Sequence, residues 1–232
     1  NFAKIPRSLS ARSFNKKINF RQKKDMIANK DTILFAGDST TDADKKATFM
    51  ELGNGYVRLI FHFLRAFRPE NKYHLVNAGV SGNTSRDLLA RWEQDVLAKK
   101  PDVVFCMIGI NDVWRHFDTF EKEGYYVSLE EYERNLETMA ERSKEVREFV
   151  FVSPFFMEGN RTDAMRQMTE RYAAVMKKVA DRRGLRFVDM QAAFDKFLQH
   201  RSGISISWDR VHPGDTGSMI IARRLLEEMN IG

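Results

Sequence analysis

Short, continuous apolar runs alternate with longer amphipathic segments from residue 31 to the end of the chain. Runs of this kind, without polar alternation, are typical of parallel strands that are buried on both faces. They cover 32–37, 74–79, 102–109, 149–154 and 185–190. Between them, apolar positions recur at helical spacing and predict helices over 48–68, 84–99, 128–147, 162–183 and 214–230.

This alternation predicts an α/β fold, a three-layer α/β/α sandwich around a central, mostly five-stranded parallel sheet with right-handed crossovers. Ser128, followed by Glu131, has the spacing of a capping box before the third helix, and Thr162 precedes the fourth. No repeat or low-complexity linker interrupts the pattern. At 232 residues, 43% of them hydrophobic, the chain can build one continuous core.

Charge is distributed unevenly along the chain. The net charge is +6, but residues 1–30 hold nine Lys or Arg against the single acid Asp25, which leaves residues 31–232 at −2. We therefore predict a basic N-terminal arm over 1–30 and a catalytic domain over 31–232. Such an arm can bind polyanions or lipid, but apolar residues interrupt its charges. We favour an extension that is solvated or packs on a neighbouring subunit, and expect neither nucleic acid nor membrane as a partner.

The single cysteine, Cys106, lies in an apolar run and is expected to be a buried core residue. It permits no internal disulfide. No apolar stretch approaches the roughly 20 residues that span a bilayer. Nothing visible indicates a signal peptide, and we expect a cytoplasmic location.

Four short blocks carry the candidate chemistry: GDST at 37–40, NAGVSGN at 77–83, GIND at 109–112 and DRVHP at 209–213. The first three follow the ends of predicted strands, and the fourth opens the last predicted helix, with Pro213 near its first turn. Ligands of open α/β sheets bind beyond the carboxyl ends of the strands. The blocks are therefore expected to meet at one rim of the sheet.

Together the blocks supply the groups that acyl transfer by a serine needs. Ser39 requires an adjacent base, and the imidazole of His212 can accept and return its proton. Asp209, three residues earlier, can orient that ring. The backbone N–H groups of Ser39 and Gly79, with the Asn111 amide, would then stabilise an oxyanion.

Each block alone also has a structural interpretation. GDST and GIND can be ordinary turns, Gly79 and Gly82 can relieve a tight turn, and the Asp209–His212 pair can stand at a helix start. Their order and their common position at strand ends favour catalysis.

The blocks resemble those of the SGNH (GDSL-type) hydrolase superfamily, whose fold is flavodoxin-like. The segments 52–57, 80–96, 107–115, 153–160 and 208–213 are similar to the intracellular acetylxylan esterase branch. This resemblance implies deacetylation of xylo-oligosaccharides and a homo-oligomer, with Ser39, His212 and Asp209 as triad and Gly79 and Asn111 in the oxyanion hole. Two features depart from it, namely Thr40 beside the serine and the arm over 1–30.

Aromatic side chains near the blocks bear on the substrate. Trp114 and Trp208 can stack on sugar rings or serve as core or interface residues, and Asp38 is a further candidate for substrate binding. His116 is a weaker candidate for the cleft. Trp92 lies within a predicted helix and is expected to be a packing residue. The histidines lack ligand spacing and no phosphate loop is present, so we expect neither metal nor cofactor.

The sequence thus predicts a serine esterase that acts on an acetylated carbohydrate or another short acyl ester. A lysophospholipase or thioesterase of the same superfamily is the alternative enzyme. A non-catalytic binding module that uses the basic arm is the alternative from another class.

Overall fold

All five apolar runs form strands of one parallel sheet. The structure is a computed structural model that describes residues 26–46, 51–118 and 126–231. The strand order is β2-β1-β3-β4-β5, and every neighbouring pair is parallel. The strands are β1 (Thr32–Gly37), β2 (His74–Gly79), β3 (Val103–Met107), β4 (Glu148–Val152) and β5 (Arg186–Val188).

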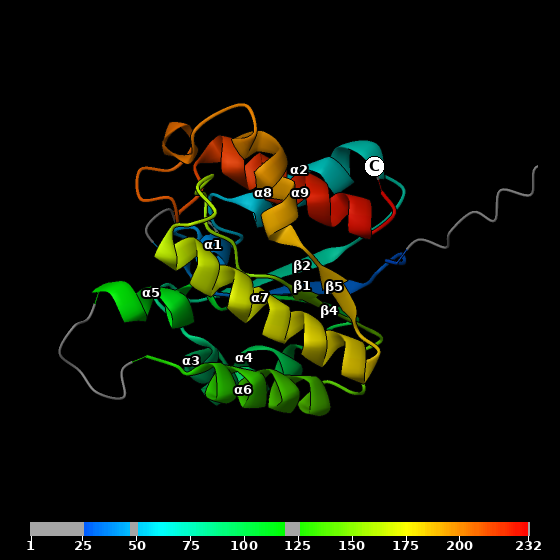
Figure 1. The fold of residues 1–232 in the computed structure, drawn as a ribbon. Helices are drawn as coiled ribbons and strands as arrows, with labels where there is room; N and C mark the ends of the chain where they lie inside the picture. Colours follow the sequence, from blue (N-terminus) through cyan, green and yellow to red (C-terminus); the bar gives the residue numbers. More distant parts are fainter. Residues whose placement is uncertain (1–25, 47–50, 119–125, 232) are drawn as a thin grey trace, which may run out of the picture.

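Helices cover both faces of this sheet, as the sequence predicts (Figure 1). One layer holds α2, α8 and α9, and the other holds α3, α4, α6 and α7. The helices are α1 (Ser39–Asp42), α2 (Tyr56–Phe67), α3 (Ser85–Ala90), α4 (Trp92–Asp95), α5 (Ile110–Asp118), α6 (Leu129–Arg142), α7 (Ala164–Arg183), α8 (Met190–Leu198) and α9 (Asp215–Glu228), with short 3₁₀ turns η1 (Leu97–Lys99) and η2 (Gly203–Ser205).

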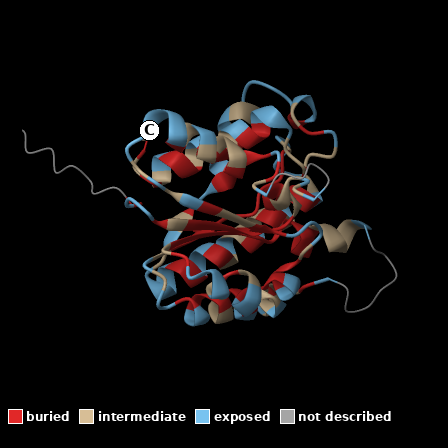
Figure 2. Ribbon diagram, turned by 180° about the vertical axis from the view of Figure 1, so that it is seen from behind, coloured by how far each residue is buried: buried red, intermediate tan, exposed pale blue. Residues whose placement is uncertain are grey.

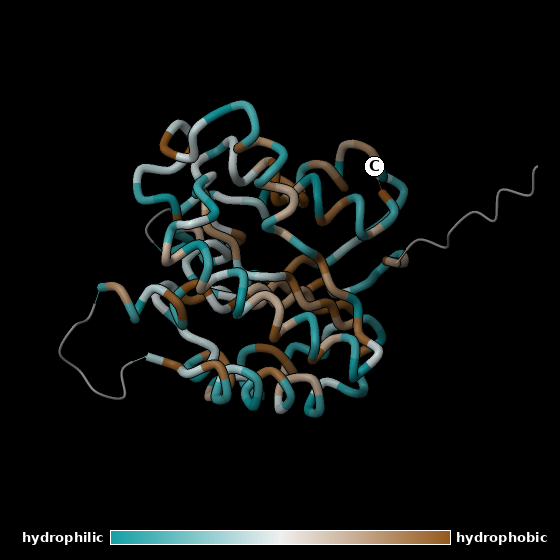
Figure 3. Tube along the Cα trace, viewed as in Figure 1, coloured by the Kyte–Doolittle hydropathy of each residue, from teal (hydrophilic) through white to brown (hydrophobic). Residues whose placement is uncertain are grey.

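The sheet separates two apolar cores. Successive side chains of a strand point to opposite faces, and in β1 Ile33 and Phe35 enter one core while Leu34 and Ala36 enter the other. Buried positions therefore follow the strands and the inner helix faces (Figure 2), and the hydrophobic residues concentrate there (Figure 3). Cys106 and Trp92 are fully buried, as expected.

Several predicted helix bounds differ from the structure. The predicted helix over 48–68 begins only at Tyr56, and residues 47–50 lie outside the described residues. The predicted helix over 84–99 is divided into α3, α4 and η1, because the backbone of Arg91 leaves the helical region at φ −105° and ψ 7°. Helices α5 and α8 follow strands where no helix was predicted.

The helix starts are partly as predicted. Ser128 caps α6 by accepting a hydrogen bond from the N–H of Glu131 at 3.2 Å. The carboxylate of Glu131 is held instead by Arg86. Helix α7 is capped by Asp163 rather than Thr162, since the Asp163 carboxylate accepts from the N–H of the third helical residue.

The predicted boundary after residue 30 lies too late in the chain. Met26 and Ile27 are each only 4% exposed and belong to the core between the sheet and α2 and α9. The N–H of Met26 also donates to the carbonyl of Met229. Residues 26–30 therefore belong to the folded domain. The rest of the predicted arm, 1–25, lies outside the described residues.

Candidate active site

Ser39 stands directly beyond the central strand. Strand β1 ends at Gly37, Asp38 caps the one-turn helix α1, and Ser39 is the first residue of that helix. The end of β1 is level with the ends of both neighbours, since Gly37 pairs with Gly79 on one side and with Met107 on the other. The chain order reverses at this strand, and ligands of open α/β sheets bind at such a position.

The structure does not support Asp38 as a residue that contacts substrate. Its side chain is 2% exposed and accepts a hydrogen bond from the N–H of Thr40 at 3.0 Å. Burial raises the pKa of Asp38 to about 6, although the hydrogen bonds from Thr40 and the charge of His212 act in the opposite direction. Asp38 therefore serves as a buried cap that fixes the turn carrying Ser39.

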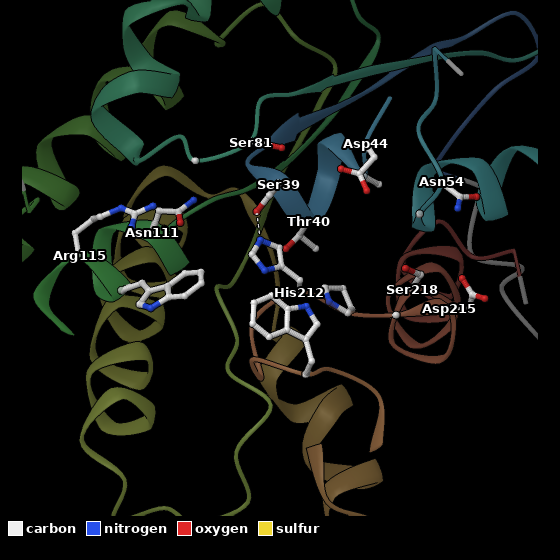
Figure 4. A pocket seen from close by; sticks show the side chains of 17 residues that line it. Ser39, Thr40, Asp44, Asn54, Ser81, Asn111, Arg115, His212, Asp215 and Ser218 are labelled. Carbon is white, nitrogen blue, oxygen red and sulfur yellow. Dashed lines mark hydrogen bonds between the residues drawn. The ribbon is translucent and has the colours of Figure 1, made fainter. Parts of the chain in front are cut away.

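Ser39, His212 and Asp209 form one hydrogen-bonded line, of which Figure 4 shows the bond between Ser39 and His212. The Oγ of Ser39 lies 2.8 Å from Nε2 of His212, and Nδ1 of the same ring lies 2.5 Å from Oδ2 of Asp209. The serine and the histidine are 173 residues apart in sequence. The sequence prediction that these three residues meet at one rim is consistent with this geometry.

The carboxylate of Asp209 is nearly enclosed, with 7% of its side chain exposed. Burial acts to raise its pKa, but hydrogen bonds from the His212 ring and from the N–H groups of His212 and Val211 outweigh burial and hold the pKa below its usual range. Asp209 is therefore ionised at neutral pH. An ionised carboxylate at Nδ1 keeps the proton on that nitrogen and leaves Nε2 free to accept one.

The loop that carries this pair is fastened by Arg210. This residue has a left-handed backbone with φ 66°, and its carbonyl accepts from the N–H of Met157 at 2.9 Å. Its guanidinium pairs with Glu158 and lies 4.9 Å from the centre of the Phe156 ring. The segment after β4 thus holds the Asp209–His212 loop against the sheet.

Two of the three expected oxyanion donors face the cleft. Asn111 lies in the first turn of α5 and is only 2% exposed, and its Nδ2 donates to the carbonyl of Asn83 at 3.0 Å. One amide hydrogen is used in that bond, so the other remains for a ligand. The backbone N–H of Ser39 has no partner among the described residues.

The third expected donor, Gly79, is a wrong assignment. Its N–H donates to Oδ1 of Asn77 at 2.9 Å, and it is buried against α1, where a Cβ would lie 2.2 Å from the N atom of Asp42. Gly82 lines the cleft instead, with φ 82° and an N–H that has no partner in the part of the chain that the structure describes. The sequence signal was present, because Gly82 stands in the same block.

The cleft around Ser39 has a volume of about 650 Å³ and is lined by both polar and apolar groups. Asn111 and Arg115 lie on one side of the Ser39–His212 pair, and a group of polar side chains lies on the other (Figure 4). Trp114 packs its ring against His212 with the ring centres 5.8 Å apart. Trp208 lines the rim and is 81% exposed. The polar group comprises Asp44, Asn54, Asp215 and Ser218.

His116 points away from the cleft. Its Nε2 lies 3.1 Å from the hydroxyl of Tyr172, and its ring packs on Tyr126. Among the described residues, no group of three or more His, Cys, Asp or Glu side chains could hold a metal ion. The described helices include none that is long and apolar enough to cross a membrane.

The chain is similar over most of its length to known esterases. The model of the GDSL-like lipase/acylhydrolase family matches residues 35–220. An acetylxylan esterase from Geobacillus stearothermophilus is 43% identical over 209 residues, which are 88% of this chain and 95% of that protein.

Solved structures show the same similarity. Axe2, an acetylxylan esterase from Geobacillus stearothermophilus, has a TM-score of 0.85 at 42% identity, covering 89% of this chain and 97% of that chain. LAE5, an alpha/beta hydrolase enzyme from the metagenome of Lake Arreo, has a TM-score of 0.85 at 43% identity, covering 88% of this chain and 97% of that chain. Three variants described as catalytic mutants of Axe2 replace a serine, an aspartate and a histidine by alanine.

Proposed function

The chain belongs to the GDSL-like lipase/acylhydrolase family, and from that premise we propose that it is a serine esterase that removes acetyl groups from xylo-oligosaccharides. The observation that carries the proposal is the line from Ser39 through His212 to Asp209, which opens into a cleft with polar side chains on both sides of Ser39. The identity of 43% to an acetylxylan esterase supports the choice of substrate.

In the proposed reaction Ser39 attacks the ester carbonyl. Nε2 of His212 takes the hydroxyl proton and then gives it to the departing sugar oxygen, which leaves an acetyl group on Ser39. Water then attacks the carbonyl of that acetyl group while His212 again takes and returns a proton, and acetate is released. Asp209 stabilises the imidazolium that forms in both halves.

The negative charge on the carbonyl oxygen needs donors that are already in place. We propose that these donors are the backbone N–H groups of Ser39 and Gly82 and the Nδ2 amide of Asn111. Removing one such donor from an acyl-transfer site costs on the order of 10²–10³ in rate.

The lining of the cleft supports a sugar ester over a long-chain lipid. A fatty acyl chain requires a long apolar groove, whereas the cleft on Ser39 carries polar side chains at both ends. The apolar cavity behind the turn, lined by Met107, Ile110 and Phe155 among others, holds only about 10 Å³. We propose that Trp114 and Trp208 contact the sugar rings, because aromatic faces bind the apolar faces of sugars.

The proposal is tested with a series of aryl esters of increasing acyl length and with acetylated xylo-oligosaccharides. Acetyl esters should be the best substrates, and Ser39→Ala should reduce turnover to background with an unchanged melting temperature. Ser205→Ala, an exposed serine outside the cleft, is the matched control and should keep full activity. Turnover that survives in Ser39→Ala rejects the nucleophile, and a preference for acyl chains of about eight carbons or more rejects the carbohydrate ester.

We also propose that the protein is a homo-oligomer. Trp208 and Ile204 are 81% and 59% exposed and both line a second hollow of about 500 Å³ beside the cleft. Exposed apolar side chains that gather in one place are typical of interaction sites. Replacing Trp208 by alanine separates its two roles, since a lower mass in solution indicates an interface and a weaker affinity for the oligosaccharide alone indicates sugar stacking.

A further inference from the structure

Arg91 lies beneath the rim of the sheet, at the break between α3 and α4. Its side chain is 16% exposed and makes four hydrogen bonds. Nη2 donates to the carbonyl of Gly37 at 3.0 Å, and Nη1 donates to the carbonyl of Ala78 at 2.9 Å. Nε donates to Oδ1 of Asn83 at 2.7 Å, and Nη1 also pairs with Asp95 at 3.1 Å.

The first three acceptors belong to the segments that carry the proposed oxyanion donors. Gly37 ends β1 and stands two residues before Ser39. Ala78 is the second-last residue of β2, which leads into the turn that contains Gly82. Asn83 follows Gly82 and accepts through its carbonyl the hydrogen bond from Nδ2 of Asn111.

We propose that Arg91 is a positioning residue for the oxyanion hole, holding the three donors in one fixed arrangement through a single guanidinium group. The proposal rests on the proposed function, because the donors have this role only in ester hydrolysis. A guanidinium group is planar and offers five N–H donors in a rigid fork, so it can tie three segments together in fixed geometry. A lysine ammonium is a flexible point charge and cannot reproduce the fork.

The charge of Arg91 acts locally. Asp95 pairs with it, so the main contribution is the geometry of the hydrogen bonds and not a long-range field. Oxyanion stabilisation depends on donors that are in place before charge develops, and a displacement of about 1 Å can cost on the order of 10²-fold in rate.

The loop after β2 has other anchors, which keep it folded when Arg91 is replaced. Both carboxylate oxygens of Asp112 accept from the N–H of Ser85, at 2.9 and 3.0 Å, and Asn135 donates to the hydroxyl of Ser85 at 2.9 Å. Thr84 and Asp87 form a capping box at the start of α3. Loss of Arg91 should therefore displace the donors without unfolding the domain.

The test compares Arg91→Lys with the wild type on an aryl acetate and measures binding of methylboronic acid, which forms a tetrahedral adduct with a catalytic serine. We expect kcat to fall on the order of 10- to 100-fold with KM within about twofold. Affinity for the boronic acid should fall by the same factor as kcat/KM. Xylo-oligosaccharide that carries no acetyl group should bind to Arg91→Lys as tightly as it binds to the wild type.

Arg147→Lys is the matched control. Arg147 is also a multidentate arginine, bonded to Asp31 and to the carbonyl of Met26, but at the opposite end of the sheet. Its replacement should lower the melting temperature and leave kcat unchanged. If Arg91→Lys behaves in the same way, the role of Arg91 is structural and the proposal is wrong.

A third variant, Asn83→Ala, removes the side-chain acceptor of the Arg91 Nε hydrogen bond and leaves Arg91 in place. Its kcat should fall on the order of tenfold, so it tests the proposal even if Arg91→Lys fails to fold. An unchanged kcat in Asn83→Ala overturns the proposal. Failure of the wild type itself to form an adduct with the boronic acid or to hydrolyse the acetate contradicts the proposed function, and the two failures are thus distinguishable.

Discussion

At the scale of single residues, the site depends on hydrogen bonds that keep charged and polar groups in one state. Asp209 is the clearest case, because three donors from two consecutive residues hold its carboxylate ionised in a nearly enclosed position. The ionised form in turn sets which nitrogen of His212 carries the proton. A small chemical change at Asp209 should therefore have a large catalytic effect.

Asp209→Asn tests this dependence. Oδ1 of Asp209 accepts the two backbone N–H groups, so in the asparagine the NH2 group takes the place of Oδ2 and donates to Nδ1. Nε2 of His212 then carries the ring proton and presents it to Ser39, and kcat should fall on the order of 10³–10⁴ with little change in KM. Steady-state kinetics and circular dichroism measure activity and folding. Ser207→Ala removes only the hydroxyl bond to Oδ1 of Asp209, at 3.0 Å, and should cost less than about tenfold. Equal losses in the two variants would contradict this account.

A second prediction concerns the two glycines of the second block. In Gly79→Ala the new Cβ would lie 2.2 Å from the backbone of α1, so the helix must move and the melting temperature should fall steeply. In Gly82→Ala the Cβ meets nothing within 4 Å, and the positive φ costs only about 1–2 kcal/mol. Gly82→Ala should instead lower kcat, because the alanine shifts the N–H at the cleft. The reverse order of stabilities would restore Gly79 as the cleft residue.

The choice between these glycines could not be made from the sequence. Both stand in one block after a predicted strand, and strand ends are uncertain by a residue or more. What separates them is the contact with α1 and the hydrogen bond to Asn77, which are tertiary features. The pairing of Ser39 with His212 could be predicted from the sequence, because the order of the blocks and their approximate position after strands are visible in local patterns.

At the scale of elements, buried polar contacts join the helices behind the site. Asp112 on α5 is fully buried and accepts three hydrogen bonds from Ser85 on α3. Burial raises the pKa of Asp112 to about 7, against the hydrogen bonds from Ser85, which lower it. The contact between α3 and α5 therefore includes a carboxyl group that titrates near neutral pH.

The pH dependence of stability follows from this shift. The folded pKa of about 7 lies above the ordinary aspartate value of 3.8, so between these two values the folded state binds more protons than the unfolded state. The free energy of unfolding contributed by Asp112 should thus fall as the pH rises through this window, by at most about 1.4 kcal/mol per pH unit. Urea unfolding of the wild type and Asp112→Asn at about pH 5 and about pH 7 measures this contribution.

The difference between the two proteins isolates this group from the other carboxylates. The wild type should lose stability relative to Asp112→Asn between the lower and the higher pH. A constant difference would mean that Asp112 has the same pKa in the folded and unfolded states.

Helix types were easier to predict than helix ends. The amphipathic pattern over 84–99 is a sound helical signal, but Arg91 interrupts it in order to reach the carbonyls of Gly37 and Ala78. That contact links residues more than ten positions apart, so no local pattern reveals it. Helix α8 was missed because its short apolar stripe follows directly on β5.

At the scale of the whole molecule, the sheet and both helix layers form one domain that begins no later than Met26. Met26 and Ile27 close the end of one core. The N–H of Lys30 donates to the carbonyl of Lys72, and the N–H of Lys72 donates to Oδ1 of Asn29. The charge pattern placed the boundary at residue 30 because Lys30 continues the basic composition. The composition shows only where basic residues are frequent, whereas the start of the domain depends on the buried side chains of Met26 and Ile27.

Two truncations distinguish the domain from the remaining part of the predicted arm. A chain that begins at Met26 should keep the wild-type unfolding midpoint and kcat. A chain that begins at Asp31 loses two buried side chains, each worth about 1.5–3 kcal/mol, and should unfold at a lower urea concentration. Mass in solution of the first truncation also tests whether residues 1–25 contribute to the predicted oligomer. Equal midpoints for both chains would place the boundary after residue 30.

The separation of 173 residues between Ser39 and His212 has a consequence for how the protein is made. The nucleophile emerges during synthesis well before its base, which lies just before α9. Chains are synthesised and fold from the N-terminus onward. A chain synthesised only as far as α8 therefore carries a serine without its base, and the first hydrolysed ester reports that the loop carrying His212 has reached Ser39.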